Sequence, residues 1–342
     1  MRNEVVMITG ANGEIGHGLI KALAKQQGKR IVALDLKPLD DDLASLCERF
    51  VQGDILDSML LGRLMAEYEI TTIYHLASIL STKAEYNPET AHKINVEGTL
   101  NLLRMGVELS TWQGNSVKFI YPSSIAVYGL PDLETKQKEG KIKEWMWCNP
   151  ITMYGCNKLY CENLGQYYTA HYRQLAKDRG KHSIDFRCVR FPGLISADTI
   201  PTGGTSDYGP EMIHAAAKGE PYSCFVRPDT RIPFMAMPDA IKSLLMLESA
   251  SCDTLTRSVY NVTSFSPTAQ ELFEMVRTAY PDAEVAFDVN PPRQAIVDTW
   301  PQDCDDSAAR HDWGWKPDFD MQNSFNDYLL PSIKKLYQSV RK

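Results

Sequence analysis

Short apolar runs alternate with longer amphipathic segments through the first half of the chain. Each run has the length and composition of a buried strand, and the runs lie at 4–10, 30–35, 49–55, 72–78, 117–124 and 183–191. The segment after the first run carries Ile15, Leu19, Ile20 and Leu23 on one helical face. Further helices are predicted at about 59–68, 88–109 and 154–176. Repeated strand–helix–strand units with short connections predict an α/β fold of the Rossmann type, a doubly wound parallel sheet with helices on both faces.

The pattern loosens beyond residue 191. Helical patterns near 209–218, 238–249 and 267–280 are interleaved with short apolar runs at 222–226, 232–237, 258–263 and 284–289. We therefore expect a Rossmann domain at 1–190 and a smaller C-terminal α/β lobe at 191–342, with some later elements returning to the large sheet.

Two segments interrupt this pattern. Residues 134–150 are charged and then aromatic, which predicts a surface excursion beside the carboxyl edge of the sheet. Residues 190–208 are rich in Gly, Pro, Thr, Ser and Asp, which is typical either of a solvated linker or of a loop that shapes a pocket.

Composition narrows the class of protein. The chain has 342 residues, of which 44% are hydrophobic and 23% charged, and its net charge of −7 argues against a nucleic-acid partner. No run reaches about 18 apolar residues, so no membrane span is expected. The first strand begins almost at once, which predicts a cytoplasmic protein without a signal peptide. The eight cysteines show no zinc-site spacing, so we expect reduced thiols and no metal.

A glycine-rich turn follows the first strand and opens a helix. Gly10, Gly13 and Gly16 are spaced as in turns that bring backbone N–H groups and a helix N-terminus to a pyrophosphate. Asp35 ends the second strand 22 residues after Gly13, where a carboxylate accepts hydrogen bonds from ribose hydroxyls. Asp35 would repel a 2′-phosphate, which favours NAD over NADP, although Lys37 nearby weakens that inference. Plain turn glycines are the alternative interpretation.

Candidate chemistry lies where the fifth strand ends. Ser123 and Ser124 end that strand, and Tyr154 and Lys158 follow on one face of a predicted helix. In an open parallel sheet, ligands bind outside the carboxyl ends of the strands. A tyrosine that acts as a base needs its pKa lowered from ~10 to ~7, and a lysine ammonium ~4 Å away supplies about that. A helix-surface Tyr/Lys pair is the alternative.

These motifs resemble those of the extended short-chain dehydrogenase/reductase superfamily. "TGANGEIG", "GDI", "HLAS", "SSIAVYG" and "YGCNK" match it in order, which implies that Ser124, Tyr154 and Lys158 are the catalytic set. Nucleotide-sugar enzymes of the superfamily carry an Asn where this chain has Pro192-Gly193, and dehydratases carry Asp-Glu where it has Ile125-Ala126.

The C-terminal motifs are more specific. "RFPGLIS", "GGTSDY", "IPFMAMPDA" and "DTWPQDCDDSAARHDWGW" are most similar to the short-chain, epimerase-like type of L-threonine 3-dehydrogenase. That resemblance implies an enzyme that oxidises the Cβ hydroxyl of L-threonine with NAD, giving L-2-amino-3-oxobutyrate, with Tyr154 as the base. It also implies a homodimer paired through the helices at about 88–109 and 154–176. Phe234 and Ala236 depart from the family pattern, so we expect the rim of the substrate pocket to differ from that of the family.

The resemblance implies a binding role for two sets of residues. The residues expected to contact NAD are Gly10, Asn12, Gly13, Glu14, Ile15, Gly16, Asp35, Asp54, Ile55, Leu76, Ala77, Ser78, Asn95, Tyr154, Lys158, Pro192 and Leu194. The residues expected to contact the small-molecule substrate are Ser81, Ser124, Tyr154, Gly193, Thr205, Ser206 and Trp300. For three of these a structural role is the alternative: Ser81 as a helix cap, Thr205 in loop geometry and Trp300 in core packing.

Two other functions are compatible with the motifs. One is a nucleotide-sugar 4-epimerase or dehydratase that keeps NAD bound, against which Pro192-Gly193 argues. The other is a catalytically silent NAD-sensing protein, against which the intact set of Ser124, Tyr154 and Lys158 argues.

Overall fold

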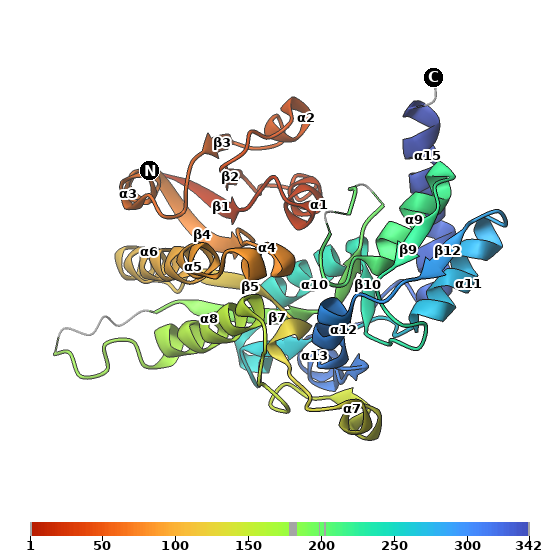
Figure 1. Cartoon of the computed structure of the whole chain (residues 1–342). Helices are drawn as coiled ribbons and strands as arrows, with labels where there is room; N and C mark the ends of the chain where they lie inside the picture. Colours follow the sequence, from red (N-terminus) through yellow and green to blue (C-terminus); the bar gives the residue numbers. More distant parts are fainter. Residues whose placement is uncertain (1, 178–182, 198, 202, 341–342) are drawn as a thin grey trace. The chain divides into compact units, whose positions relative to one another are not determined.

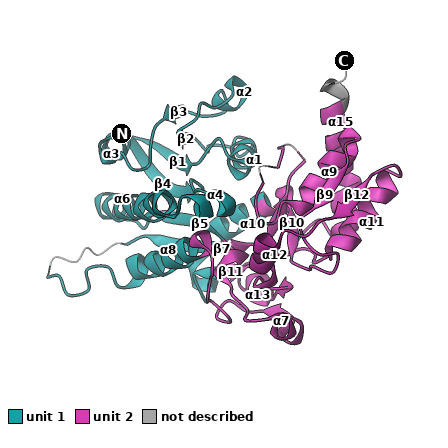
Figure 2. Ribbon diagram, in the orientation of Figure 1, with its two compact units in different colours: residues 1–123, 156–189, 241–259 teal, residues 124–155, 190–240, 260–342 magenta. Residues whose placement is uncertain are grey.

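The computed structural model describes residues 2–177, 183–197, 199–201 and 203–340, so two positions of the 190–208 loop, 198 and 202, lie outside the described residues. The chain divides into two compact units, each assembled from three separate segments (Figure 2). Unit 1 comprises residues 1–123, 156–189 and 241–259, and unit 2 comprises residues 124–155, 190–240 and 260–342. The single boundary expected at 190/191 therefore lies next to one observed crossing, at 189/190, but the chain also changes unit at four other places.

Most of a seven-stranded sheet with the order β11-β7-β5-β4-β1-β2-β3 lies in unit 1 (Figure 1). The strands are β1 (Asn3–Thr9), β2 (Ile31–Asp35), β3 (Arg49–Gln52), β4 (Tyr68–His75), β5 (Lys118–Ser124), β7 (Asp185–Phe191) and β11 (Val259–Asn261). The registers along β3-β2-β1-β4-β5 are parallel, as the alternating sequence pattern predicts. The strand order reverses between β1 and β4, and this switch point is where open α/β sheets bind ligands.

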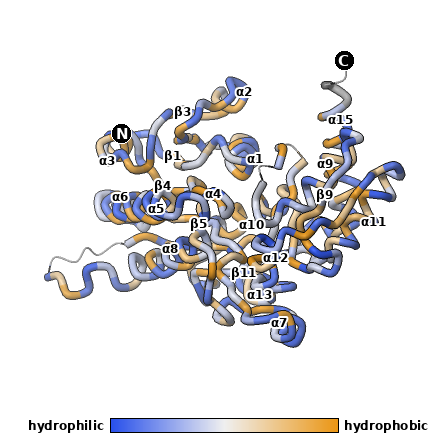
Figure 3. The backbone as a smooth tube through the Cα atoms, in the orientation of Figure 1, coloured by the Kyte–Doolittle hydropathy of each residue, from blue (hydrophilic) through white to orange (hydrophobic). Residues whose placement is uncertain are grey.

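Helices cover the sheet because each carries one apolar face. They are α1 (Glu14–Leu23), α2 (Asp41–Ala44), α3 (Ser58–Glu67), α4 (Ser81–Tyr86), α5 (Pro88–His92), α6 (Gly98–Gln113), α8 (Met153–Ala170) and α10 (Met237–Ser249). A π-helical turn at Lys93–Glu97 joins α5 to α6, so the helix predicted at 88–109 is continuous but not uniform. α3 and α6 pack together on β4, and Figure 3 shows hydrophobic and hydrophilic residues mixed along α6. No helix in the described ranges is long and apolar enough to cross a membrane.

A buried arginine explains why residues 241–259 belong to unit 1. Arg187 on β7 is 1% exposed, and its guanidinium donates to the carboxylate of Asp185 at 2.6 Å and to the carbonyl oxygens of Leu247 and Ala250 at 2.6 and 2.7 Å. These carbonyls end α10, where a cation compensates the negative end of the helix dipole. Arg187 therefore anchors the end of α10 to β7.

Replacing Arg187 should destabilise the fold strongly. An Arg187→Met variant removes the guanidinium that pairs with the half-buried Asp185 carboxylate and that donates to the Leu247 and Ala250 carbonyls, and we expect a loss of about 3 kcal/mol in the free energy of unfolding. Urea denaturation followed by circular dichroism measures this loss. Arg63→Met, at an exposed position on α3, is the matched control and should change stability by less than about 0.5 kcal/mol. Equal stability of the two variants would contradict the anchoring role.

The described part of unit 2 contains three two-stranded parallel pairs. β6 (Lys141–Ile142) pairs with β13 (Asp303–Cys304), β8 (Gly193–Ile195) with β10 (Phe234–Ala236), and β9 (Tyr222–Cys224) with β12 (Val285–Phe287). The helices are α7 (Leu133–Glu139), α9 (Tyr208–Lys218), α11 (Ala269–Ala279), α12 (Pro291–Asp298), α13 (Ser307–Trp313), α14 (Met321–Asn323) and α15 (Leu330–Val340). The helices and short strands expected in the second half therefore form, β11 joins the large sheet, and most of α10 lies in unit 1.

The prediction that residues 134–150 form a surface excursion is wrong for part of the segment. Lys136 is 5% exposed, Ile142 is 0% exposed and Glu144 is 9% exposed. Arg190 and Asn261 hold the segment: Arg190 donates to the Glu144 carbonyl at 2.6 Å, and Asn261 donates to the Ile142 carbonyl at 2.9 Å. Burial of charged side chains through such contacts leaves no hydrophobic periodicity in the sequence, so the pattern does not reveal it.

Candidate active site

A cavity of about 270 Å³ lies in unit 1 at the carboxyl ends of β1, β2, β3 and β4. This is the edge of the sheet where the strand order reverses. The cavity brings together nine residues that the sequence assigned to the cofactor, namely Gly10, Asn12, Gly13, Asp35, Asp54, Ile55, Leu76, Ala77 and Ser78.

The first glycine of the turn is sterically required. Gly10 has φ +70°, and a Cβ at this position would lie 2.5 Å from the backbone nitrogen of Ala77. The turn therefore approaches the end of β4 more closely than any side chain allows. Gly13 precedes the first residue of α1, so the positive end of that helix faces the cavity.

Two strand-end carboxylates lie in the cavity wall. Asp35 accepts hydrogen bonds from the backbone N–H groups of Asn12 and Lys37, each at 2.9 Å, which ties the end of β2 to the glycine turn. Asp54 accepts from the backbone N–H of Leu56 at 2.9 Å and so closes the turn after β3. Both are fixed acceptors with remaining lone pairs for ligand hydroxyl or amino groups.

Eight of the predicted cofactor residues lie outside the cavity wall: Glu14, Ile15, Gly16, Asn95, Tyr154, Lys158, Pro192 and Leu194. The Asn95 side chain accepts from the Ile79 backbone N–H at 2.7 Å and donates to the Ile79 carbonyl at 3.0 Å. It therefore fixes the backbone of Ile79, which is a residue of the cavity wall.

Six residues of the wall are not among those predicted to contact the cofactor: Leu34, Leu36, Lys37, Gly53, Ile79 and Ile94. All six adjoin, or lie within two residues of, a residue already assigned to the cofactor, and Ile94 is next to Asn95. For the other five the signal was present in the strand-end motifs, while Ile94 lies on the π-helical turn and belongs to no such motif.

The candidate catalytic serine and tyrosine are brought together within unit 2. Ser124 ends β5, and its hydroxyl accepts from the Ala126 backbone N–H at 3.1 Å, an arrangement in which the hydroxyl can still donate. Tyr154 lies in the first turn of α8, next to Gly155, where a Cβ would lie only 2.1 Å from the Ala126 carbonyl oxygen. The turn after Ser124 and the start of the Tyr154 helix are thus in direct contact.

The pKa of Tyr154 departs from the expected direction. Burial raises this pKa above its usual range, whereas the sequence argument expected Lys158 to lower it. Lys158 is 4% exposed, donates to the Pro122 carbonyl at 2.7 Å and lies 4.5 Å from the centre of the Tyr121 ring. Burial lowers the pKa of Lys158 to about 8, so this side chain is charged at neutral pH.

Two candidate substrate residues, Gly193 and Ser206, also meet in unit 2. A Cβ at Gly193 would lie 3.3 Å from Ser206 Cβ and 2.7 Å from the Phe234 ring, so the start of β8 contacts the 203–207 loop. Gly204 is held by Asp207, which accepts its N–H at 2.6 Å, and by Arg293, which donates to its carbonyl at 2.7 Å. This end of the 190–208 loop is therefore fixed by contacts within unit 2, unlike a solvated linker.

The remaining predicted residues are placed as follows. Pro192 is buried, Leu194 is half-buried on β8, Thr205 is 5% exposed and Trp300 is 4% exposed beside α12. Ser81 is the first residue of α4, but the N-cap is Leu80, so Ser81 does not cap this helix. Among the described residues there is no group of three side chains that could hold a metal ion.

The fold and the site define a Rossmann-type α/β protein. Residues 6–263 match the model of the NAD dependent epimerase/dehydratase family, and the chain belongs to that family.

Its similarity to individual proteins spans nearly the whole chain. The chain is 35% identical to the mitochondrial L-threonine 3-dehydrogenase of Bos taurus over 92% of this chain and 79% of that protein. It matches the structure of a monomeric L-threonine 3-dehydrogenase from a metagenome with a TM-score of 0.84 and 35% identity, covering 97% of this chain and 99% of the other. A GalE-like L-threonine dehydrogenase from Cupriavidus necator has a TM-score of 0.83 and 33% identity, with 97% and 99% of the chains covered.

Proposed function

We propose that this protein is an NAD-dependent L-threonine 3-dehydrogenase, which oxidises the Cβ hydroxyl of L-threonine to give L-2-amino-3-oxobutyrate. The observation that carries the proposal is similarity to L-threonine dehydrogenases over 92% or more of the chain. The glycine-turn cavity and the contact between the Ser124 turn and the Tyr154 helix support it.

The cavity fits a dinucleotide by its chemistry. A glycine turn that excludes any Cβ, a helix N-terminus and a strand-end carboxylate are the groups that accommodate a pyrophosphate and ribose hydroxyls. In this proposal Gly10 to Gly13 hold the pyrophosphate, Asp35 the adenosine ribose, and Asp54 with Ile55 the adenine. When bound, NAD⁺ accepts a hydride from the substrate carbon.

The chain's own residues orient the substrate and move its proton. Ser124 donates a hydrogen bond to the hydroxyl oxygen of L-threonine, and Tyr154 takes the hydroxyl proton as the base. Since burial raises the pKa of Tyr154, the phenolate needs cationic help at the moment of reaction. Lys158, four residues along the same helix and charged at neutral pH, is the residue proposed to provide it and to hold the nicotinamide ribose.

The zwitterionic substrate needs polar anchors as well as a cover. We assign Ser81, Thr205 and Ser206 to the amino and carboxylate groups, Gly193 to the pocket floor and Trp300 to its cover. Pro192 and Leu194 are assigned to the nicotinamide amide through backbone contacts.

A substrate panel tests the proposed function. Purified protein is incubated with NAD and a series of β-hydroxy amino acids, and NADH absorbance is followed. L-threonine should give the highest kcat/KM of the series. No NADH with L-threonine, together with activity on another hydroxy acid or tight binding of a nucleotide sugar, would show that the proposal is wrong.

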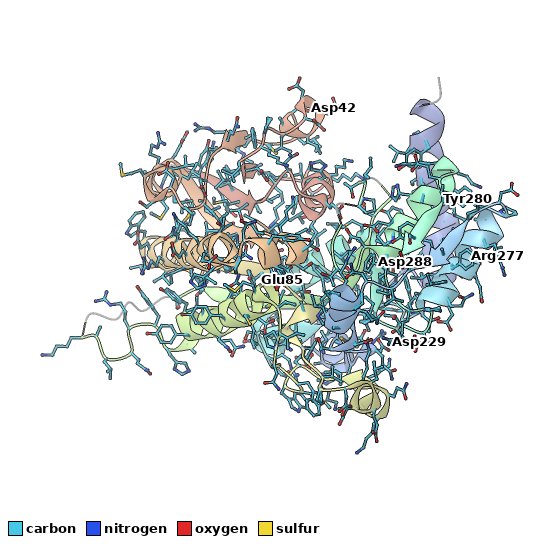
Figure 4. All side chains as sticks on the ribbon, viewed as in Figure 1. Asp42, Glu85, Asp229, Arg277, Tyr280 and Asp288 are labelled. Carbon is cyan, nitrogen blue, oxygen red and sulfur yellow. The ribbon has the colours of Figure 1, made fainter. Side chains whose placement is uncertain are left out.

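Asp35 should set the preference for NAD over NADP. In an Asp35→Ser variant the carboxylate no longer repels a 2′-phosphate, and Lys37 in the cavity wall can attract it. We expect the ratio of kcat/KM for NADP to that for NAD to rise about tenfold or more. Asp42→Ser, at an exposed position on α2 outside the wall (Figure 4), is the control and should leave the ratio unchanged. An unchanged ratio in Asp35→Ser would rule out the ribose contact.

A further inference from the structure

Residues 130–142, which include α7 and β6, contact the chain both before and after Trp300. The Leu130 backbone N–H donates to the Thr299 carbonyl at 2.8 Å, and Lys136 Nζ donates to the Val297 carbonyl at 3.2 Å. Further along, β6 pairs with β13, which begins three residues after Trp300. Residues 130–142 therefore hold residues 297–304 at several successive points.

One carbonyl oxygen connects Lys136 directly to Trp300. The Val297 carbonyl at the end of α12 accepts from Lys136 Nζ at 3.2 Å and from the Trp300 backbone N–H at 3.1 Å. Lys136 is 5% exposed and Trp300 is 4% exposed, so this shared contact is shielded from water. A charge-assisted hydrogen bond in such a place is stronger and more directional than one at the surface.

Lys136 is not simply one half of an ion pair. Asp298 and Asp229 both lie near enough to attract its charge, and Arg227 near enough to repel it. Arg227 forms ion pairs with both carboxylates, at 2.9 Å to Asp298 and 3.0 Å to Asp229. The Asp229 side chain, labelled in Figure 4, is exposed. The ammonium of Lys136 goes instead to a backbone carbonyl at the negative end of α12.

We propose that Lys136 is a positioning residue that fixes Trp300 as the cover of the substrate, through the Val297 carbonyl that the two residues share. The proposal rests on the proposed function, in which Trp300 covers L-threonine. It also gives residues 130–142 a role: they hold one wall of the substrate site in place.

The charge of Lys136 makes this contact sensitive to pH. Burial lowers the pKa of Lys136 to about 8, with Asp298 and Asp229 opposing the shift and Arg227 adding to it. Above about pH 8 the ammonium loses its proton and the hydrogen bond to Val297 weakens. The KM for L-threonine in the wild type should therefore rise above that pH. Lys136→Arg keeps its charge above pH 8, so its KM should not show this rise. The substrate amine titrates in the same way with both proteins, so the difference in KM between them reports on residue 136.

The experiment uses the full chain and four variants: Lys136→Met, Lys136→Arg, Trp300→Phe and the double variant Lys136→Met/Trp300→Phe. Lys136→Met should raise the KM for L-threonine about tenfold while kcat changes less than about twofold, and Lys136→Arg should restore KM. Adding Lys136→Met to Trp300→Phe should have no further effect on KM, because the residue that it positions is already changed. Lys138→Met, exposed on α7, is the matched control and should behave as the wild type.

A second measurement does not depend on activity. Hydrogen exchange of the Trp300 backbone N–H should be about tenfold faster in Lys136→Met than in the wild type and restored in Lys136→Arg. Unchanged exchange would overturn the positioning role, as would faster exchange without a change in KM, or additive effects in the double variant. If the wild type does not oxidise L-threonine, the proposed function fails, and the exchange rates alone decide whether Lys136 positions Trp300.

Discussion

A Tyr154→Phe variant should turn over L-threonine about 10²- to 10⁴-fold more slowly than the wild type while binding NAD equally well. The phenyl ring keeps the packing of the first turn of α8 against the Ser124 turn, because that contact is made by Gly155 and Ala126. The substitution removes the phenolic hydroxyl, which is the proposed proton acceptor. Steady-state kinetics give kcat, and calorimetric titration gives the Kd for NAD.

The control for this variant lies on the same helix. Tyr160 is 51% exposed, and Tyr160→Phe removes a hydroxyl from α8 without touching the Ser124 turn. It should retain the kcat of the wild type. Retained turnover in Tyr154→Phe would exclude Tyr154 as the base, and an equal loss in both variants would indicate a general effect on α8.

A Gly10→Ala variant should lose about 100-fold in affinity for NAD. Its new methyl group would lie 2.5 Å from the backbone nitrogen of Ala77, so the turn must move by roughly 1 Å, a displacement that can cost about 10²-fold when it misplaces a bound group. Calorimetric titration with NAD measures the effect, and circular dichroism shows whether the variant is folded.

Gly28→Ala separates backbone strain from collision. Gly28 has φ +79°, close to the φ +70° of Gly10, but a Cβ there would meet nothing within 4 Å. The left-handed conformation should cost Gly28→Ala about 1–2 kcal/mol of stability, with NAD affinity unchanged. If both variants lose affinity alike, the loss reflects stability and not the shape of the glycine turn.

The sheet and the cofactor edge were predictable from sequence because they depend on local patterns. Six apolar runs predicted six strands of the large sheet, and the glycine turn and Asp35 follow directly from strand ends. The contacts that divide the chain into units depend instead on residues far apart. Arg187 reaches carbonyls about sixty residues later, and Arg190 reaches the Glu144 carbonyl, with no periodic signal at either end.

The pKa of Tyr154 was unpredictable for a related reason. The sequence shows that Lys158 lies four residues after Tyr154 on the same helix. It does not show how deeply the Tyr154 ring is buried, and that burial raises its pKa. Pairing of α6 and α8 in a homodimer stays a prediction, which size-exclusion chromatography with light scattering can test.

The order of segments in unit 1 has a consequence for synthesis on the ribosome. The edge strand β11 ends at Asn261, and α10, which Arg187 anchors, ends at Ser249. A nascent chain that has emerged only as far as β7 has most of the large sheet but lacks the carbonyl groups of Leu247 and Ala250, to which the buried Arg187 guanidinium donates. Completion of unit 1 must therefore wait until residues 241–259 are made, by which time residues 124–155 and 190–240 of unit 2 have already been translated.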